Sequence, residues 1–391
     1  MWKKACGTLT GFAAHDLRKR SGSGLSGRVF GRATRILNVP SEFAQGSYNQ
    51  AARIMANQSH AEISSAGGTI GNLFIRRKPP TPQTIPGAQT NQFSDLNGSQ
   101  VSLSCEKMIE ILDLCYVRLG TRNLESTLQF ATEMLGLQPV RREENRAYVR
   151  GDDRDHDICY IQGDPAEHIL GFELENGRKL EEAHDALVSA GISVHRGAAA
   201  ECADRRVQAF VSFSDPTGNR FDLVVRPFKA TRRYFPTRDA GITEFSHVGL
   251  RTTDARRDEA FWTKHFNIRP NDWIGDAGLL SFDAVHHRIA LFPADRPGIQ
   301  HVNFQVASLD DIMRSYYFMS SQQVRIVFGP GRHATSGAMF LYFEGPDGMV
   351  YEYSHGVRMI DDPNYRPRQF PFTPEAFCVW GARPDIPEFQ D

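Results

Sequence analysis

Two histidines and a glutamate with the chemistry of metal ligands lie far apart in the C-terminal half of the chain. His247 lies in the run FSHVGL, His301 in GIQHVNF and Glu352 in VYEYS. Any one of them alone would more often be a core histidine or a paired carboxylate, but all three occupy equivalent positions in strand-like runs. Two imidazoles and one carboxylate leave adjacent metal positions open, which suits non-haem Fe(II) binding O2 and substrate together. The three residues are therefore predicted to hold a metal.

The elements that must position these ligands occur in two copies. The runs IEILDLCYVRLGTRNLESTLQFATEMLGL and ITEFSHVGLRTTDARRDEAFWTKHFNI each predict an alternating strand, a turn and an amphipathic helix. Each copy then continues with a second strand and helix, and ends in a hairpin around a DPTG or GPDG turn. Each half is therefore predicted to be a repeated βαβββ unit of an α+β fold, whose strands curl into a half-open barrel.

The first copy lacks the predicted metal ligands. Tyr116 and Asp222 take the places of the first histidine and the glutamate. Ile169 takes the place of the second histidine, and the neighbouring His168 points to the opposite face of the strand. We therefore predict a first module at residues 108–230 that is a scaffold without metal, in which His156 and His168 are structural or solvated. The second module, residues 242–368, would carry the catalytic site, and residues 369–391 would form a tail.

Residues 1–107 differ in composition from the rest. Asp16 is the single acidic residue before Pro40, among many basic and serine residues. This composition resembles an organellar transit peptide, and residues 78–100 are typical of a linker. The alternatives are an unusual, poorly ordered extension or an upstream stretch included through a misplaced start. A cytoplasmic location is predicted, or a mitochondrial one if the basic start is a transit peptide.

The overall composition excludes several classes of function. A formal net charge of -1 gives no reason to invoke nucleic acid, for which a basic face would be expected. No apolar run is long enough to predict a membrane span. The six cysteines are scattered and lack metal-binding spacing, so they are predicted to be ordinary thiols in a reducing compartment.

The second copy resembles the type I extradiol dioxygenases of the vicinal oxygen chelate superfamily, such as the 2,3-dihydroxybiphenyl and catechol 2,3-dioxygenases. The likeness covers residues 108–368 and is most specific in GPGRHATSGAMFLYFEGPDGMVYEY. In that family a GRH histidine is followed at fixed intervals by a tyrosine and by the metal glutamate. His333, Tyr342 and Glu352 have the same intervals here. The string VHHRIALF supplies the family's acid–base histidine at His287, with His286 as a bystander.

The resemblance implies an oxidoreductase that inserts both atoms of O2 into a catechol-type diol beside its hydroxyls. His247, His301 and Glu352 would hold Fe(II), or Mn(II), since both metals accept these ligands. His287 would be the acid–base group, because an imidazole can hold or give a proton near neutral pH. Tyr342 would donate a hydrogen bond to the substrate oxygen, and His333 would favour the anionic diol. The implied partners are a small-molecule catechol, O2 and further copies of the chain in a homo-oligomer.

Two positions depart from branches of that family. Phe328 stands where the homoprotocatechuate branch has an arginine for a substrate carboxylate, so a carboxylate-bearing substrate is less favoured. Thr335 stands where the biphenyl-diol branch has an asparagine, so the choice between a 3-substituted catechol and a 2,3-dihydroxybiphenyl-like diol stays open. The segment DDPNYRPRQFPF looks like the family's pocket lid, in which Arg366 and Arg368 either close over the site or lie in solvent.

Three other functions are compatible with parts of this pattern. A side-chain oxygenase of the 4-hydroxyphenylpyruvate dioxygenase type uses the same ligands but lacks the GRH–tyrosine string. Glyoxalase I takes four protein ligands and has glutathione contacts that the sequence does not show. A non-catalytic protein that binds aromatic compounds on this fold would need no metal ligands.

Overall fold

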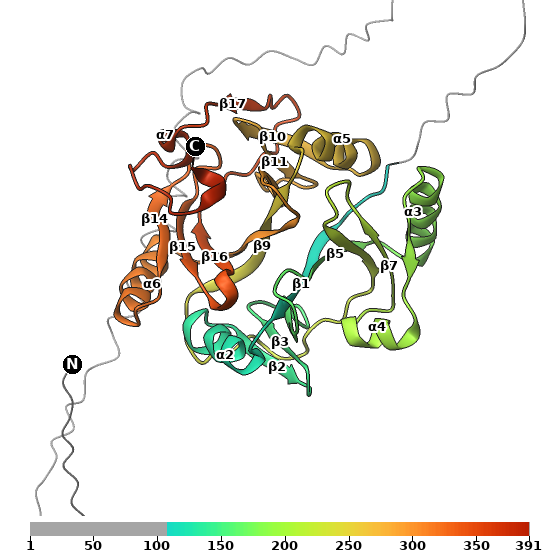
Figure 1. Ribbon diagram of the computed structural model, residues 1–391, viewed down its shortest axis with the longest axis horizontal. Coiled ribbons are helices and arrows are strands. Elements are labelled where there is room, and N and C mark those ends of the chain that lie inside the picture. The colour runs from blue at the N-terminus through green and yellow to red at the C-terminus, as the bar shows by residue number, and fades with distance from the viewer. Residues whose placement is uncertain (1–107, 391) are drawn as a thin grey trace, which may run out of the picture. The chain divides into compact units, whose positions relative to one another are not determined.

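The computed structural model describes residues 108–390 (Figure 1). The predictions for residues 1–107, a targeting segment or extension with a linker, lie outside the described residues. Among the described helices, none has the length and apolar character needed to cross a membrane. The four cysteines in this part of the chain are free and buried: Cys115, Cys159, Cys202 and Cys378.

The first module is built on an eight-stranded sheet with the order β2-β3-β4-β1-β5-β8-β7-β6. Its first half contains β1 (Asp113–Thr121), α2 (Leu124–Gln129), a π-helical turn (Phe130–Met134), β2 (Gln138–Arg142), β3 (Arg146–Arg150) and β4 (Ile158–Gln162). Its second half contains β5 (His168–Leu174), α3 (Gly177–Ser189), β6 (His195–Arg196), α4 (Ala199–Arg205), β7 (Ala209–Ser214) and β8 (Arg220–Val225).

The second module repeats this order in a nine-stranded sheet, β14-β15-β16-β13-β9-β12-β11-β10-β17. Its first half contains β9 (Ile242–Thr252), α5 (Ala255–His265), β10 (Arg269–Ile274), β11 (Ala277–Ser281) and β12 (Ile289–Pro293). Its second half contains β13 (Gly298–Val306), α6 (Leu309–Ser321), β14 (Ile326–Arg332), β15 (Met339–Glu344), a 3-10 turn (Pro346–Gly348) and β16 (Val350–His355). The C-terminal segment adds β17 (Arg368–Phe370), α7 (Pro374–Phe377) and a second 3-10 turn (Pro387–Phe389).

The predicted fold class is confirmed. Each module consists of two βαβββ units, and each sheet curls without closing, because the outermost strands of its order do not pair with each other. The helices begin where short polar side chains cap the backbone. Asp254 accepts a hydrogen bond from the Arg257 amide at the start of α5, and Ser308 accepts one from the Asp311 amide at the start of α6.

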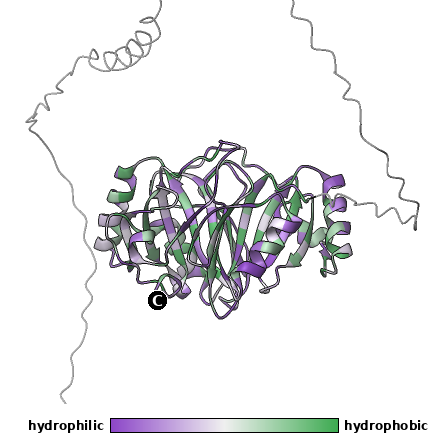
Figure 2. Cartoon of the chain, turned by 90° about the horizontal axis from the view of Figure 1, so that it is seen from above, coloured by the Kyte–Doolittle hydropathy of each residue, from purple (hydrophilic) through white to green (hydrophobic). Residues whose placement is uncertain are grey.

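The two modules share one hydrophobic core. The ring centre of Trp262 in α5 lies 4.7 Å from that of Phe221 in β8, so a helix of the second module packs against the sheet of the first. The ring centres of Phe130, in the first module, and Tyr351, in β16 of the second, lie 5.9 Å apart. The hydroxyls of Tyr160 and Tyr351 form a 2.8 Å hydrogen bond. Figure 2 shows hydrophobic and hydrophilic residues mixed along the strands, and the central strand β13 is buried along its whole length. This shared core holds the central strands of both sheets in place.

Candidate metal centre

Three neighbouring strands at the middle of the second sheet bring the predicted metal ligands together. Asn303 in β13 pairs with His247 in β9 on one side and with Glu352 in β16 on the other. His301 lies two residues before Asn303 in the same strand, so its side chain projects from the same face of the sheet. One potential ligand atom from each of His247, His301 and Glu352 lies within 4.8 Å of the others. Strand register therefore explains how distant residues converge.

The distances within this cluster fit a site for a metal ion. Nε2 of His247 lies 3.0 Å from Nε2 of His301 and 3.0 Å from Oε2 of Glu352. Nε2 of His301 lies 3.4 Å from the same carboxylate oxygen. This oxygen is buried and has no hydrogen-bond partner of adequate geometry. A buried carboxylate oxygen without a partner is costly unless a cation satisfies it, so the donor set fits a divalent metal.

The surroundings set the protonation states that metal binding requires. Burial lowers the pKa of His247 to about 4, so its imidazole is neutral at neutral pH. Burial alone would raise the pKa of Glu352, but the neighbouring histidines, His247 first among them, hold it well below the usual range. Metals bind neutral imidazoles and ionised carboxylates. The cluster therefore presents its ligand atoms in the forms that bind a metal.

The ring of His301 is oriented by its own neighbours. Its Nδ1 forms a short hydrogen bond with the side-chain oxygen of Gln300, which directs Nε2 toward the other ligands. Gly249 in β9 leaves space for the ring, because a Cβ atom at this position would lie 2.4 Å from His301 Nδ1. A glycine is therefore needed here for close approach rather than for its backbone angles.

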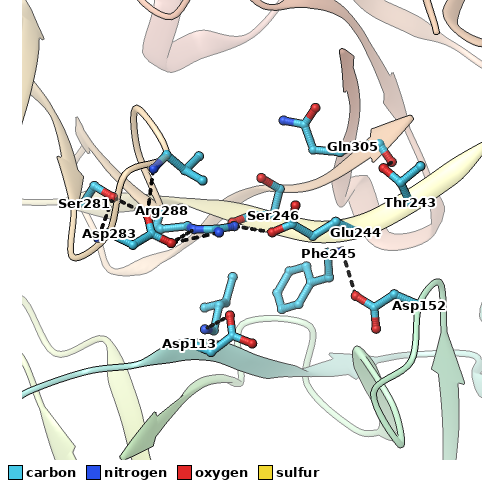
Figure 3. A network of polar contacts seen from close by, with 12 residues as sticks. Asp113, Asp152, Thr243, Glu244, Phe245, Ser246, Ser281, Asp283, Arg288 and Gln305 are labelled. Carbon is cyan, nitrogen blue, oxygen red and sulfur yellow. Dashed lines mark hydrogen bonds and ion pairs between the residues drawn. The ribbon is translucent and has the colours of Figure 1, made fainter. Parts of the chain in front are cut away.

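A polar network ties the strand of His247 to the loop that carries the next candidate residue (Figure 3). The Arg288 guanidinium donates to the Ser246 carbonyl at 2.9 Å, to Glu244 at 2.6 Å and to Asp283 at 2.9 Å. Asp152 of the first module accepts a 3.1 Å hydrogen bond from the Phe245 amide. Arg288 directly follows His287 in the chain, so this network fixes His287 relative to the ligand strand.

His287 lies against the candidate ligands, as the sequence predicts. Its side chain is buried, and its ring centre is 4.2 Å from that of His247. Burial lowers its pKa well below the usual range, with the neighbouring histidines adding to the effect. The structure thus places a neutral imidazole beside the three converging ligand atoms.

His333 and Tyr342 lie on the other side of the cluster. Nδ1 of His333 donates to the Phe377 carbonyl at 2.9 Å, which directs Nε2 to within 3.1 Å of the Tyr342 hydroxyl and 3.4 Å of Glu352 Oε1. Burial, together with the Glu352 carboxylate, raises the pKa of Tyr342 well above its usual range. The phenol therefore keeps its proton and can donate a hydrogen bond. All six predicted site residues lie in this one cluster.

His286, predicted to be a bystander beside His287, has specific buried contacts. Its side chain is completely buried and connects His287 to Asp272, with Nε2 2.8 Å from Asp272 Oδ2. Arg368, left open between a rim and a solvent role, forms an ion pair with the same carboxylate at 2.5 Å, whereas Arg366 is exposed. The doubled histidine of VHHR was the available signal, but Asp272 had none, because its partners lie in the loop after β11 and in the segment after β16.

Phenylalanines line the neighbourhood of Tyr342, and of these only Phe328 was identifiable from the sequence. The Phe389 ring, from the C-terminal segment, lies 4.8 Å from Phe292, 6.1 Å from Phe328 and 6.1 Å from Tyr342. Glu388 next to it forms an ion pair with Arg251. The tail thus contributes an apolar surface to the interior of the second module.

The equivalent place in the first module is filled by its own side chains. Gly171 in β5 pairs with Tyr116 in β1 and with Asp222 in β8, so Ile169, two residues earlier, corresponds to His301. The Tyr116 hydroxyl donates to Asp222 at 2.8 Å, and Arg205 donates to the same oxygen at 2.6 Å. This register agrees with the alignment of the two copies made from the sequence.

The two histidines assigned structural or solvated roles in this module are both buried. His168 hydrogen bonds to Asn219 at 3.0 Å, and the ring of His156 stacks on that of Tyr116 with centres 5.3 Å apart. Both are therefore packing and hydrogen-bonding residues of the first module.

Comparison with known proteins places this arrangement in context. The family model of the glyoxalase/bleomycin resistance protein/dioxygenase superfamily matches residues 114–223 and 244–353. An iron-dependent extradiol dioxygenase of Rhodococcus jostii is 25% identical over 312 residues, covering 70% of this chain and 97% of the relative. A 3-methylcatechol 2,3-dioxygenase of Pseudomonas putida is 29% identical, covering 64% and 92%. The Mn(II)-bound glyoxalase from Novosphingobium aromaticivorans has the same fold, with a TM-score of 0.65 at 23% identity, covering 72% and 94%.

Proposed function

Because the chain belongs to the glyoxalase/bleomycin resistance protein/dioxygenase superfamily, we propose that it is an extradiol dioxygenase that opens a catechol-type ring. The observation that carries the proposal is the convergence of His247, His301 and Glu352 with three further polar side chains around them. Curated relatives over most of the described chain are named as extradiol dioxygenases, which supports the same reaction.

The metal would be Fe(II), with Mn(II) as the alternative. His247, His301 and Glu352 would hold it, and the carboxylate oxygen that lacks a hydrogen-bond partner would gain one. When bound, such an ion supplies a Lewis acid that acidifies the diol hydroxyls and a place for O2. One relative is named as iron-dependent and one structure of the same fold contains Mn(II), so both metals occur among similar proteins.

The remaining side chains divide the proton chemistry of the diol. Tyr342 keeps its proton and would donate a hydrogen bond to one diol oxygen. With both ring nitrogens of His333 protonated, Nδ1 would donate to the Phe377 carbonyl and Nε2 to the Tyr342 oxygen. This arrangement would leave the phenol proton for the diol and favour the anionic diol. His287 is neutral and buried, so it would accept a proton from the second hydroxyl and return it as the ring opens.

The substrate would carry an apolar group beside the diol. Phe328 and Phe389 are buried around Tyr342, and an apolar surface disfavours a carboxylate, because a buried charge needs a partner. We therefore propose a 3-substituted catechol or a 2,3-dihydroxybiphenyl-like diol. The ring would be cleaved between a hydroxyl-bearing carbon and the adjacent ring carbon that carries no hydroxyl.

The test is anaerobic loading with Fe(II), followed by addition of 3-substituted catechols and 2,3-dihydroxybiphenyl in air. We expect a yellow ring-opened product that appears with matching O2 uptake and is abolished in Glu352→Ala. A protein that binds metal but turns over none of these diols would instead be a side-chain oxygenase of the same superfamily. A protein that binds aromatic compounds but no metal would be a non-catalytic binding protein.

A further inference from the structure

A second set of buried polar groups forms a continuous chain that ends on His287. Nδ1 of His287 lies 3.1 Å from Nδ1 of His286, and Nε2 of His286 lies 2.8 Å from Oδ2 of Asp272. The side chains of His286 and Asp272 are completely buried. Water therefore cannot replace either of these two hydrogen bonds, and the donor and acceptor at each link must be complementary.

The donors around Asp272 show that its carboxylate is ionised. Oδ1 accepts hydrogen bonds from the Arg368 amide at 2.9 Å, from Arg368 Nε at 3.0 Å and from the Tyr365 hydroxyl at 3.0 Å. Oδ2 accepts from Arg368 Nη2 at 2.5 Å. Although burial opposes ionisation, the hydrogen bonds from His286 and Arg368 lower the pKa of Asp272 to about 2. An ionised carboxylate can only accept hydrogen bonds.

The ionised Asp272 carboxylate determines which nitrogens of His286 and His287 carry a proton. Because Asp272 accepts, Nε2 of His286 must carry a proton. Burial also lowers the pKa of His286, so its imidazole is neutral and its Nδ1 is an acceptor. The remaining partner, Nδ1 of His287, must then donate. Its Nε2, on the other side of the ring, is left with a lone pair.

We propose that Asp272 and His286 are positioning residues that hold His287 in the tautomer with Nδ1 protonated and Nε2 free to accept a proton. The inference rests on the proposed function, in which His287 is the acid–base group. A buried carboxylate orients a general base in this way in hydrolase triads, where an amide in its place gives the wrong tautomer. Here the carboxylate acts through an intervening histidine.

The C-terminal segment completes this chain. Arg368 in β17 pairs with Asp272 in β10 and also donates to the Thr335 carbonyl at 2.7 Å, two residues beyond His333. Asn271 donates to the His286 carbonyl at 2.7 Å, which fixes the backbone of the histidine pair. The segment after β16 therefore connects the loop of His333 with the chain that ends on His287.

The decisive variant is Asp272→Asn, which keeps the shape but can present an amide donor to His286. The chain then reverses: His286 Nδ1 donates, His287 Nδ1 accepts, and the proton of His287 moves to Nε2. We expect kcat for diol cleavage to fall by at least about tenfold, with KM and metal content within about twofold of wild type. The matched control is Asp204→Asn in the first module, since Asp204 binds Arg118, Arg146 and Tyr148 but no histidine.

A readout independent of turnover is the tautomer itself. Long-range 1H–15N spectra of histidine-labelled protein, without metal and with diamagnetic Zn(II), distinguish Nδ1–H from Nε2–H, and His287→Phe assigns the signals. We expect Nδ1–H on His287 and Nε2–H on His286 in the wild type and in Asp204→Asn. In Asp272→Asn we expect the His287 proton on Nε2.

A second pair of variants tests the role of His286 in setting the His287 tautomer if Asp272→Asn does not fold. His286→Asn retains a side-chain oxygen that can accept from His287 Nδ1, whereas His286→Leu removes every acceptor. The asparagine variant should keep the wild-type tautomer of His287 and more of the wild-type kcat than the leucine variant. Equal loss in the two variants would contradict the role of the acceptor.

The outcomes separate this inference from the proposed function. Wild-type protein that cleaves no diol would overturn the proposed function, while the spectra would still decide the tautomer. Wild-type turnover with an unchanged His287 tautomer in Asp272→Asn would overturn the inference and leave the proposed function standing. An equal loss of kcat in Asp272→Asn and Asp204→Asn would also overturn it, because the effect would then be general destabilisation.

Discussion

Burial sets the proton chemistry of individual side chains around the candidate centre. It keeps His287 neutral and keeps the Tyr342 phenol protonated, so that the imidazole can accept a proton and the phenol can donate a hydrogen bond. The Glu352 carboxylate stays ionised despite its burial, because the histidines around it favour the charged form. These opposed effects within a few ångströms are typical of sites that carry out acid–base chemistry.

The role of His287 can be tested by a change that preserves its ring packing. In His287→Phe we expect wild-type metal content and anaerobic binding of a catechol, because the phenyl ring keeps the contact with His247. Turnover should fall by about 10²–10⁴-fold, the usual contribution of a general acid–base group. Steady-state O2 uptake gives the rate. Turnover equal to wild type would refute the acid–base assignment.

At the level of elements, the C-terminal segment packs into the second module instead of lying outside it. Phe377 and Phe389 belong to the same buried cluster as Phe328 and Tyr342. Glu388 and Asp385 anchor this segment through ion pairs with Arg251 and Arg325, respectively. The tail is thus a structural part of the module whose interior it covers.

Phe389 is expected to affect substrate preference. In Phe389→Ala the loss of its ring contacts with Phe292 and Tyr342 should raise KM for apolar 3-substituted catechols more than KM for catechol itself. The expected increase is about tenfold, since losing the apolar contact of a substituent with its pocket costs roughly 1–3 kcal/mol and 1.4 kcal/mol is a factor of about ten. Phe235→Ala is the control, because this side chain is 80% exposed. Parallel changes for both substrates would rule out selectivity at this position.

The ion pair between Asp272 in β10 and Arg368 in β17 should make the free energy of unfolding depend on pH. The folded pKa of Asp272 is about 2, below an unfolded value of about 3.9. The stabilisation is therefore fully present above pH ~4 and is lost as the pH falls toward 2. It amounts to about 2.6 kcal/mol. Between pH 5 and pH 3 the difference in unfolding free energy between wild type and Asp272→Asn should shrink by about 1 kcal/mol. Urea unfolding at both pH values measures it, and a constant difference would contradict the ion pair.

For the whole molecule, the two repeated modules carry different side chains in their interiors. The interior of the second holds the candidate metal ligands. At the equivalent place in the first, Asp222 binds Tyr116, Arg205 and Ser212. The shared core, through Trp262 and Tyr351, connects the stability of each module with the other. We propose that the first module supports the second without taking part in the chemistry.

If only the second module takes part in the chemistry, substituting a carboxylate in each module should have different effects. Asp222→Asn leaves the buried Arg205 without a charged partner and should lower the unfolding free energy by about 3 kcal/mol. The folded variant should keep its metal content and kcat. Glu352→Gln should instead lose metal and turnover. Denaturant unfolding combined with elemental analysis tests both variants, and loss of metal in Asp222→Asn would show that the first module shapes the site directly.

The amino-acid sequence by itself determined the repeated βαβββ pattern and the types of the site residues. Strand alternation, the DPTG and GPDG turns and the GRH–tyrosine interval are local features, so they can be read along the chain. The same local signals aligned Tyr116, Ile169 and Asp222 with the three candidate ligands, and the strand register of the two sheets agrees with that alignment.

Only the tertiary structure decided which side chains complete the site. His286 reads as a bystander in the sequence, because its partner Asp272 lies on β10 and the partner of Asp272, Arg368, lies on β17. Phe389 reads as a tail residue until the segment folds back over β15. The physical reason is the same in each case. Hydrogen bonds and packing across strands depend on register and chain path, which no short stretch of residues specifies.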